Sequence, residues 1–377
     1  MTITTYHRFL HRMALASLLI LAGCSQPAMP EKSASARVAL GKALFFDSSL
    51  SADGKISCAS CHVASKAFTD GRTVSIGVNG KAGTRNATGL AEVRLHTALF
   101  WDGREAQLTQ AVLQPFTNPN EMGLADLQTL VDQINAQGNY AALTRNGFGD
   151  PELDSARLAE TIGAYLRSLP MSPTRYDLSI SAPSVLNIDE SAGLALFKGK
   201  AACATCHHLT GTPVTLTDDQ YHHTGIGFEQ IGGDVVRLLD QLDEARRRGR
   251  PIGEVVLSDE TVAELGRFAV TRRPTELGAF RTPSLRNVAL TAPYMHDGSI
   301  PTLKEAVERE IYYRSLTQGR SINLTVEEQR QLVAFLGALT ATVPSMPPGS
   351  DISYGLDPKT STSREPASRP SSSTSTR

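Results

Sequence analysis

The sequence predicts a mostly α-helical protein built from two similar domains in tandem. Strand-like alternation of apolar and polar residues is scarce along the chain. A short segment occurs twice, as GKALF at residues 41–45 and as GLALF at residues 193–197, which indicates duplication. Apolar residues recur at helical spacing in four stretches, residues 124–135, 158–169, 235–247 and 326–339.

Each copy of the repeated segment precedes a Cys-x-x-Cys-His motif. This motif is the attachment signature of c-type haem, in which two thiols take the vinyl groups and the histidine ligates the iron. A zinc site would need four ligands in compact pairs, and a thioredoxin-like motif would occur once within a βαβ pattern; neither pattern is present. We therefore predict two covalently bound haem c groups in two cytochrome c-like domains. The attachment residues are Cys58, Cys61 and His62 in the first motif and Cys203, Cys206 and His207 in the second.

The repeated segment also predicts a helix at the start of each domain. Leu40 and Leu44 are four residues apart, as are Gly41 and Phe45, so each pair shares a helix face. We expect this short helix to pack on the haem of its own domain.

The N-terminus has the layout of an export signal, with basic residues followed by an apolar run at residues 13–22. Ten residues are too few to span a bilayer. The sequence Leu-Ala-Gly-Cys ending at Cys24 resembles the bacterial lipobox, in which the cysteine is acylated; the alternative is an ordinary cleaved signal with a chance cysteine. Ser25 is typical of sorting to the outer membrane. We expect a periplasmic protein, attached to the outer membrane only through its N-terminal lipid.

These features divide the chain into five segments. Residues 1–23 are the predicted lipoprotein signal peptide and residues 24–35 a linker after the lipid anchor. The first haem domain covers residues 36–175 and the second residues 176–343, joined around residues 170–187. Residues 344–377 are rich in Ser, Thr and Pro and are predicted to be a disordered tail, because they cannot bury enough apolar surface to offset their ordering entropy.

The composition of the chain bears on which classes of partner to expect. The net charge of −1 gives no reason to expect nucleic acid or a polybasic membrane surface, and 41% hydrophobic residues are enough for packed cores. Residues 228–262 look like an insertion, and the helix predicted at 235–247 runs into the basic sequence ARRRGR at 245–250. A basic run of this kind is usually a solvated face, although it could dock an acidic partner.

Several longer motifs resemble the bacterial di-haem cytochrome c peroxidase family, which also includes the MauG enzyme that matures methylamine dehydrogenase. The resemblance runs in order from about residue 36 to residue 339 and implies an enzyme that reacts with hydrogen peroxide. The motifs are FFD at residues 45–47, FTDG at 68–71, FWDGR at 100–104, NPNEMG at 118–123, RTPSLRN at 281–287 and TAPYMHDG at 291–298.

The resemblance implies roles for residues of the first, peroxide-reacting domain. His62 would be the proximal iron ligand of this haem, and His207 that of the second, electron-relaying haem. Glu121 falls where the family has a distal carboxylate, and a carboxyl group held near the iron can move the protons that peroxide cleavage requires. Pro115 matches the distal-pocket proline. Gln110 lies one place before the position of a glutamine common in relatives, so it carries little weight.

The resemblance also implies two features between the haems. Trp101, the only tryptophan, would lie there as an electron relay, although a lone tryptophan is more often part of a core. Asn86, Thr291 and Pro293 match a calcium site made of one amide side chain and two backbone carbonyls. Acidic ligands are lacking, so water would complete the shell.

Two departures from the peroxidase pattern bear on the branch of the family. Residues 63–95 contain no histidine, whereas classical members have one there that blocks the first iron until half-reduction. We therefore expect the first haem to be open, as in the MauG branch. The family places Met or Tyr fourteen residues after the position of His296, and this chain has Glu310. Glu310 could ligate the second iron, Tyr312 or Tyr313 could replace it, or the site could lack a sixth ligand.

Other candidate ligands are weaker. Methionine is the least expected sixth ligand, because Met295 adjoins His296 and Met346 lies in the tail. His222 and His223 form a pair that we expect in a polar loop shielding the haem edge rather than in a metal site, since no third ligand is near in sequence. His96 is expected to pack near Trp101 rather than to ligate.

Three functions remain open at this point. The first is reduction of hydrogen peroxide with electrons from a small periplasmic cytochrome c or cupredoxin. The second is peroxide-driven oxidation of side chains on a protein substrate, as MauG performs. The third is a plain electron-transfer cytochrome, which Glu121 and an open iron argue against.

Overall fold

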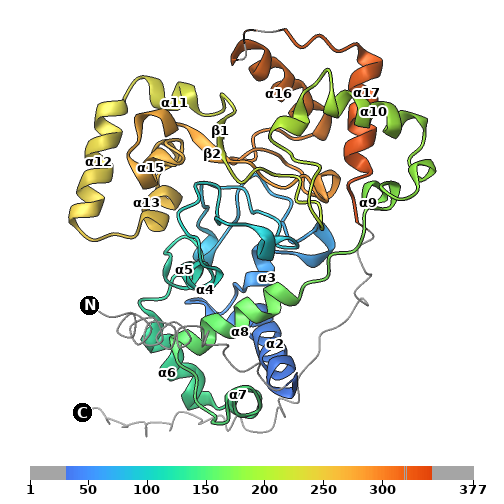
Figure 1. Ribbon diagram of the computed structural model, residues 1–377. Helices are drawn as coiled ribbons and strands as arrows, with labels where there is room; N and C mark the ends of the chain where they lie inside the picture. Colours follow the sequence, from blue (N-terminus) through green and yellow to red (C-terminus); the bar gives the residue numbers. More distant parts are fainter. Residues whose placement is uncertain (1–30, 318, 320, 342–377) are drawn as a thin grey trace, which may run out of the picture.

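The computed structural model describes residues 31–317, 319 and 321–341 (Figure 1). The predicted signal peptide, Cys24, Met346 and the tail after residue 343 lie outside this range. The predicted fold class is confirmed, since helices dominate the described chain. It has two named strands, and each is three residues long. Strand β1 (Tyr221–His223) pairs antiparallel with β2 (Ala279–Arg281), with Tyr221 opposite Arg281.

The elements form three groups. The N-terminal half contains α2 (Glu31–Phe46), α3 (Cys58–Cys61), α4 (Leu108–Ala111), α5 (Gln114–Thr117), α6 (Leu127–Gln137), α7 (Ala141–Phe148) and α8 (Ser155–Ser168). The C-terminal half contains α9 (Arg175–Ser179), α10 (Ile188–Lys198), α16 (Leu303–Thr317) and α17 (Val326–Gly337). Between α10 and α16 come α11 (Phe228–Gly232), α12 (Val235–Arg247), α13 (Ile252–Ser258), α14 (Glu260–Ala263) and α15 (Phe268–Thr271). Single 3-10 turns occupy Ser48–Leu50, Ala64–Lys66, Val78–Gly80, Val93–Leu95, Pro183–Val185, Cys203–Thr205, Pro274–Glu276 and Val288–Leu290.

The repeated segment marks the same helix crossing in each half. Gly41 of α2 lies against α8, where an added Cβ would be 1.8 Å from the carbonyl oxygen of Thr161. Gly193 of α10 lies against α17, where an added Cβ would be 2.0 Å from the carbonyl oxygen of Gln331. Only a residue without a side chain lets the two backbones approach so closely. The helix that opens each domain therefore packs directly on the helix that ends it.

The two halves also bury equivalent aromatic rings at these crossings. Phe45 and Tyr165 have ring centroids 5.2 Å apart, and Phe197 and Phe335 have theirs 5.1 Å apart. Phe45, Phe197 and Phe335 are at most 1% exposed. Two separate hydrophobic cores result, one in each half.

The four helical stretches expected from the sequence are present as α6, α8, α12 and α17. Helix α8 begins earlier than expected because Asp154 caps it by accepting a hydrogen bond from the backbone N–H of Arg157. Helix α17 begins with a reciprocal capping box between Thr325 and Glu328. Helix α2 takes in residues 31–35, which the sequence had suggested belong to a linker.

The inserted segment builds a third core around fully buried Leu238, Leu242 and Val256. This core extends beyond the expected range of 228–262 to Phe268 and Ala269, and residue Leu277 packs against it. We call residues 228–277 the inserted domain. In Figure 1 it lies on the opposite side of the two strands from α16 and α17. No helix in the described ranges is both long and apolar enough to cross a bilayer.

Candidate functional site

The two motif histidines have the same local environment. His62 follows α3, and its Nδ1 donates to the main-chain carbonyl of Phe68 at 2.9 Å. His207 follows the Cys203–Thr205 turn, and its Nδ1 donates to the carbonyl of Leu216 at 2.9 Å. Both acceptor residues have left-handed backbone, with φ of 62° at Phe68 and 55° at Leu216. Since Nδ1 holds the proton, Nε2 keeps its lone pair for a metal.

Burial of the two histidines also keeps them available as iron ligands. It lowers the pKa of His62 and lowers that of His207 to about 4, so both imidazoles are neutral near pH 7. The neutral form is the one that binds iron.

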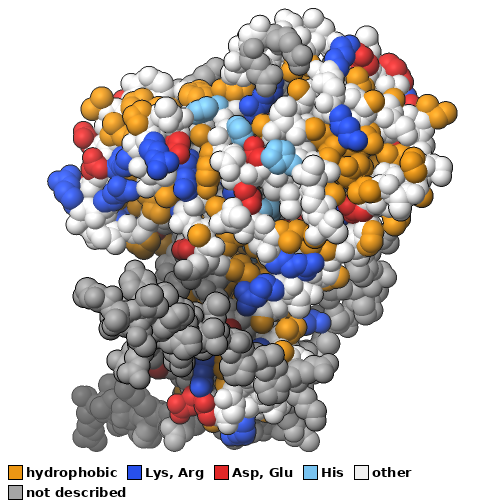
Figure 2. Space-filling model, in the orientation of Figure 1, with side chains coloured by type: hydrophobic (Ala, Val, Ile, Leu, Met, Phe, Trp, Pro, Cys, Tyr) orange, Lys and Arg blue, Asp and Glu red, His pale blue; other side chains and the backbone are white. Residues whose placement is uncertain are grey.

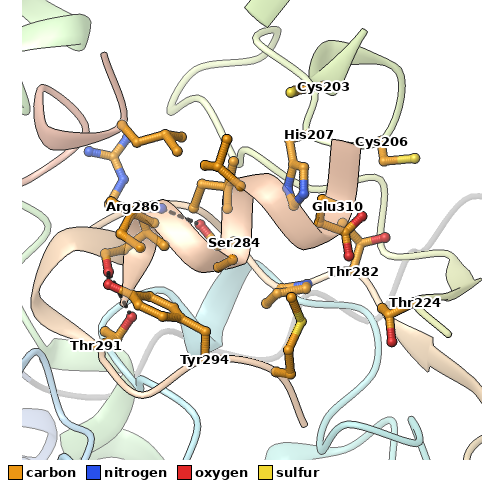
Figure 3. Close-up of a pocket in the computed structure, with 18 of the residues that line it drawn as sticks. Cys203, Cys206, His207, Thr224, Thr282, Ser284, Arg286, Thr291, Tyr294 and Glu310 are labelled. Carbon is orange, nitrogen blue, oxygen red and sulfur yellow. Dashed lines mark hydrogen bonds between the residues drawn. The ribbon is translucent and has the colours of Figure 1, made fainter. Parts of the chain in front are cut away.

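The second motif opens onto a large, mostly apolar cavity. Its cysteines and histidine lie at the edge of this cavity, and Figure 3 shows His207 and Glu310 pointing into it from different elements. The four motif cysteines have free thiols. A flat macrocycle bonded to two thiols of one turn and to the adjacent imidazole fits this set of donors and this lining. The apolar lining residues include Phe197, Leu303, Val307, Leu332 and Leu336.

Glu121 belongs to a tight loop in the N-terminal half. Its backbone N–H donates to the carbonyl of Asn118 at 3.0 Å, and its carbonyl accepts from Val78 at 2.8 Å. Burial raises the pKa of the Glu121 carboxyl to about 7, and Arg104 opposes that rise. The Glu121 charge also contributes to raising the pKa of Cys58, which indicates that the carboxyl group lies near the first motif. A carboxyl group that titrates near neutral pH can both take and return a proton.

The neighbours of Glu121 include a buried ion pair that the sequence did not single out. Arg104 contacts the fully buried Asp102 at 3.0 Å, and its Nε donates to Gln114 at 3.0 Å. Both charged residues belong to the FWDGR motif, so the motif held the signal, although only Trp101 was given a role from it. Pro115 follows Gln114 in the single turn of α5, and its carbonyl accepts from the N–H of Met122 at 3.0 Å.

Gln110, which carried little weight from the sequence alone, lies one residue before Ala111. Gln110 is exposed on α4, whereas Ala111 is buried in the first core. Gln110 is therefore not part of the buried surroundings of Glu121.

Trp101 lies where the two halves meet. Its indole N–H donates to the carbonyl of Asn86 at 2.8 Å, and its own carbonyl accepts from the N–H of Arg281 on β2 at 2.8 Å. Its side chain lines the cavity of the second motif. Asn86 in turn donates its backbone N–H to the carbonyl of His296 at 2.9 Å. Trp101 is thus bonded to both halves of the chain.

The three residues expected to bind calcium belong to the lining of this cavity. Asn86, Thr291 and Pro293 all line it. The Asn86 amide nitrogen donates to the carbonyl of Arg72 at 2.8 Å, which orients the amide and leaves Oδ1 as an acceptor. In the described chain no hydrogen bond to the carbonyl oxygens of Thr291 or Pro293 is found. Amide and carbonyl oxygens are among the ligands that calcium takes in proteins.

One face of helix α16 covers the cavity beside the second motif. Residues 303, 306, 307, 310, 311 and 314 contribute to this face. Glu310 is the carboxylate on this face, and Arg314 donates to it at 3.2 Å. Burial raises the pKa of Glu310, and Arg314 opposes the shift. The two tyrosines lie elsewhere: Tyr312 is 59% exposed, and the ring of Tyr313 packs against Gly225.

Met295 lies closer to this cavity than its sequence position had suggested. It lines the cavity, and its backbone is left-handed with φ of 73°. The neighbouring Tyr294 hydroxyl is used elsewhere, donating to the carbonyl of Val288 at 3.0 Å.

The histidine pair lies on strand β1 rather than in the loop we predicted. Successive side chains of a strand point to opposite faces, and these two histidines have different partners. His222 pairs with Asp218 at 2.8 Å, and His223 is 3.2 Å from the carbonyl of Thr275. Folding also brings Cys206 beside His222 and Asp218. A thiol bonded to haem cannot serve as a thiolate ligand, so this trio does not make a separate metal site.

Two further contacts of buried histidines were not foreseen. His296 is 1% exposed, pairs with Glu264 at 2.8 Å and stacks on Phe280 with ring centroids 3.6 Å apart. His96, which we expected near Trp101, contacts Asp219 at 3.1 Å. Glu264 lies 32 residues from His296, and no local pattern marks such a pair.

The fold and the paired sites define a class. Two helical halves each present a Cys-x-x-Cys-His turn whose histidine is bonded to a backbone carbonyl, and a partly buried carboxyl group lies near one of them. This combination is that of a di-haem c-type cytochrome with a site for proton transfer.

Comparison with known proteins gives the family. Residues 35–182 match the family model described as di-haem cytochrome c peroxidase. The methylamine utilization protein MauG of Methylorubrum extorquens is 32% identical over 335 residues, covering 86% of this chain and 83% of that protein. Cytochrome c551 peroxidase of Nitrosomonas europaea is 30% identical over 356 residues, covering 90% and 94%. The crystal structure of a MauG-like protein associated with microbial copper homeostasis superposes with a TM-score of 0.68 at 31% identity, covering 85% and 93%.

The chain therefore belongs to the di-haem cytochrome c peroxidase family, which includes MauG. It is an oxidoreductase that acts on peroxide, and membership implies two haem c groups. The attachment residues in both halves fit these groups.

Proposed function

We propose that this protein reduces hydrogen peroxide at the first haem, with electrons that enter at the second haem. The observation that carries the proposal is Glu121, a partly buried carboxyl group near the first motif whose pKa is raised to about 7. When bound, the two haems supply the redox-active iron. Glu121 supplies the proton transfer, taking a proton from one peroxide oxygen and returning it to the other.

We infer that the first haem is open to peroxide in the fully oxidised protein. The sequence supports this inference, because no histidine lies between His62 and His96 to cap the iron. Stopped-flow spectroscopy of the as-isolated ferric protein tests it. We expect the haem spectrum to change on mixing with peroxide, whereas a change that requires prior reduction would show that some residue caps the iron.

Trp101 and the calcium candidates belong to the same proposal. Trp101 bridges the two halves, because its indole N–H donates to the carbonyl of Asn86 and its main-chain carbonyl accepts from the N–H of Arg281. This position is suited to relaying an electron between the haems. A calcium ion held by Asn86, Thr291 and Pro293 would join the N-terminal loop to the C-terminal one and keep Trp101 in place. Removal of the ion by a chelator should then slow electron transfer between the haems.

We further propose that Glu310 is the sixth ligand of the second haem. Of the residues left open by the sequence, Glu310 lines the cavity with His207, whereas Tyr312 is exposed and Tyr313 packs against Gly225. A carboxylate is a hard anion and would lower the potential of that haem relative to a methionine ligand. Met295 also lines the cavity and is the competing ligand that the variants described in the Discussion test.

A second candidate function is peroxide-driven oxidation of side chains on a partner protein. It is favoured by 32% identity to MauG and by the absence of a capping histidine. Steady-state turnover of peroxide with a reduced small cytochrome c or cupredoxin separates the two functions. Brisk turnover supports peroxide scavenging. Sluggish turnover with a long-lived oxidised spectrum supports protein oxidation.

We propose that the protein works in the periplasm, anchored to the outer membrane through acylated Cys24. Covalent attachment of haem to Cys-x-x-Cys-His motifs takes place outside the cytoplasm, which agrees with export. Release of the protein into the soluble periplasmic fraction by Cys24→Ala, with an unchanged haem spectrum, would support the anchor.

A further inference from the structure

The inserted domain, residues 228–277, lies against the loop that carries Glu121. Its helix α13 faces Asn118 and Asn120, which lie three residues and one residue before Glu121. The Asn120 side-chain amide donates to the carbonyl of Leu257 at 2.6 Å, and that of Asn118 is 3.5 Å from the carbonyl of Gly253. A segment more than 130 residues away in sequence therefore holds the loop from one side.

The hydrogen bonds to Val256 and Leu257 fall at the C-terminal end of the short helix α13. The last carbonyls of α13 have no partner within the helix and need donors from elsewhere. Asn120 satisfies the carbonyl of Leu257, and the Thr84 hydroxyl donates to that of Val256 at 2.6 Å. These contacts are specific, because each places a donor on a carbonyl that would otherwise lack one.

The other side of the loop is held by the N-terminal half itself. The N–H of Val78 donates to the carbonyl of Glu121 at 2.8 Å. At Gly77 an added Cβ would lie 2.1 Å from the carbonyl oxygen of Asn120, so the two backbones are in direct contact. The loop is therefore clamped between residues 77–78 and α13.

The inserted domain also contacts the charged neighbour of Glu121. An added Cβ at Gly253 would lie 3.0 Å from both Arg104 Nε and Gln114 Oε1. Arg104 is the charged group that opposes the raised pKa of Glu121. The inserted domain thus limits the space around both the carboxyl loop and its cationic partner.

We propose that the inserted domain is a clamp on the Glu121 loop, with Asn120 as its main positioning residue. This inference rests on the proposed role of Glu121 in proton transfer. A carboxyl group transfers protons efficiently only from a fixed position, and small displacements of a catalytic group can cost about 100-fold in rate. The clamp supplies that position from a segment that is distant in sequence.

The test compares Asn120→Ala with Asn135→Ala in the full haem-loaded protein. Asn135 is a matched control, because its amide also donates to a backbone carbonyl, that of Leu153 at 2.8 Å, in the same half but away from the loop. We expect Asn120→Ala to slow the reaction of the ferric protein with peroxide by roughly 10- to 100-fold. Asn135→Ala should react at the wild-type rate. Haem content should stay at the wild-type value in both.

Two readouts are specific to positioning. Hydrogen exchange of the segment 118–123 should become faster in Asn120→Ala and not in Asn135→Ala. The midpoint of the pH–rate profile should fall below its wild-type value, because water admitted to the loop relieves the desolvation of Glu121. The charged group that faces Glu121 is Arg104; Cys58 and Cys61, the titratable groups beside it, become thioethers on haem attachment and no longer titrate.

The outcomes separate this inference from the proposed function. If Glu121→Gln reacts at the wild-type rate, the role of Glu121 is wrong and the clamp has nothing to position. If Glu121→Gln is slow but Asn120→Ala keeps both wild-type rate and wild-type exchange, the clamp is refuted alone. Should Asn120→Ala fail to accumulate, Asn120→Ser gives the same readouts, since serine keeps a polar side chain but is too short to reach Leu257.

Discussion

The indole nitrogen of Trp101 donates a hydrogen bond to the main-chain carbonyl of Asn86, 2.8 Å away. A peptide carbonyl accepts hydrogen bonds but is too weak a base to remove the indole proton. An oxidised Trp101 would therefore keep its proton and pass on an electron alone. This pairing suits a relay that is oxidised and re-reduced quickly.

We predict that Trp101→Phe slows electron transfer between the haems and leaves both attached. Phenylalanine keeps an aromatic ring but is much harder to oxidise and cannot donate to Asn86. The measurement is stopped-flow reduction of one haem followed at wavelengths that distinguish the two. Phe100→Leu, a change to the neighbouring ring, serves as the control. Equal transfer rates in Trp101→Phe and the wild type would leave Trp101 as a packing residue.

The covalent attachment predicts a simple count. Cys58→Ala and Cys203→Ala should each lose one of the two haems, because each removes a thioether from a different motif. The pyridine haemochrome assay on purified protein measures haem per chain. A wild-type value of one haem per chain would contradict the assignment of both motifs.

Glu121→Gln should leave both haems in place and slow the reaction with peroxide by about 100- to 10,000-fold, the usual contribution of a positioned acid–base group. In the wild type the carboxyl group has a raised pKa of about 7, so it is protonated below that pH and ionised above it. Because the ionised form takes the first proton, the rate should rise with pH through about 7. Glu121→Gln should show no such rise. A variant whose rate and pH profile match the wild type would assign the proton transfer to another group.

The Glu310 proposal predicts changes confined to the second haem. Glu310→Gln should alter its ligand-sensitive absorption bands and raise its potential, because an anionic ligand is replaced by a neutral group. Glu308→Gln should change neither, because Glu308 pairs with Lys304 on the same helix and is not part of the cavity lining. Redox titration with spectral monitoring is the measurement. If Met295→Leu rather than Glu310→Gln changes these bands, methionine is the ligand.

The helix crossings predict a large loss of stability on adding one methyl group. Gly41→Ala would place a Cβ 1.8 Å from a carbonyl oxygen of α8, so the helices must separate. We expect a cost of at least about 1–3 kcal/mol in the free energy of unfolding. Gly337→Ala in α17 has no atom within 4 Å of the new Cβ and should be neutral or mildly stabilising. Urea unfolding of the haem-loaded protein compares them.

Local sequence patterns were enough to predict much of the fold. The 3.6-residue spacing located α12 at its observed bounds, and the GKALF and GLALF segments identified the helices that cross at Gly41 and Gly193. Helix α8 begins earlier than the spacing predicted, because the Asp154 side chain accepts a hydrogen bond from the backbone N–H of Arg157 and so caps the helix there. The haem-binding residues were visible because their spacing is fixed by covalent chemistry.

Long-range contacts were not visible in the sequence. The pairs Asn120–Leu257 and Glu264–His296 join segments whose proximity depends on how the inserted domain packs. The position of Met295 in the lining of the second motif's cavity was likewise not indicated by the sequence. Figure 2 shows Lys and Arg side chains gathered over α12, where Arg247 and Arg248 pair locally with Glu244, so their charge is partly neutralised within the helix.

The carbonyls of Phe68 and Leu216 set the orientation of both motif imidazoles, and neither carbonyl belongs to a side chain. Ordinary amino-acid replacement at these two positions changes the side chain and retains the acceptor. A mutational scan would therefore under-report the importance of this contact, since it can be disturbed only by altering the local backbone path. The side chains of Phe68 and Leu216 can therefore change while the hydrogen bond to each imidazole is kept, because that bond depends on the local backbone path.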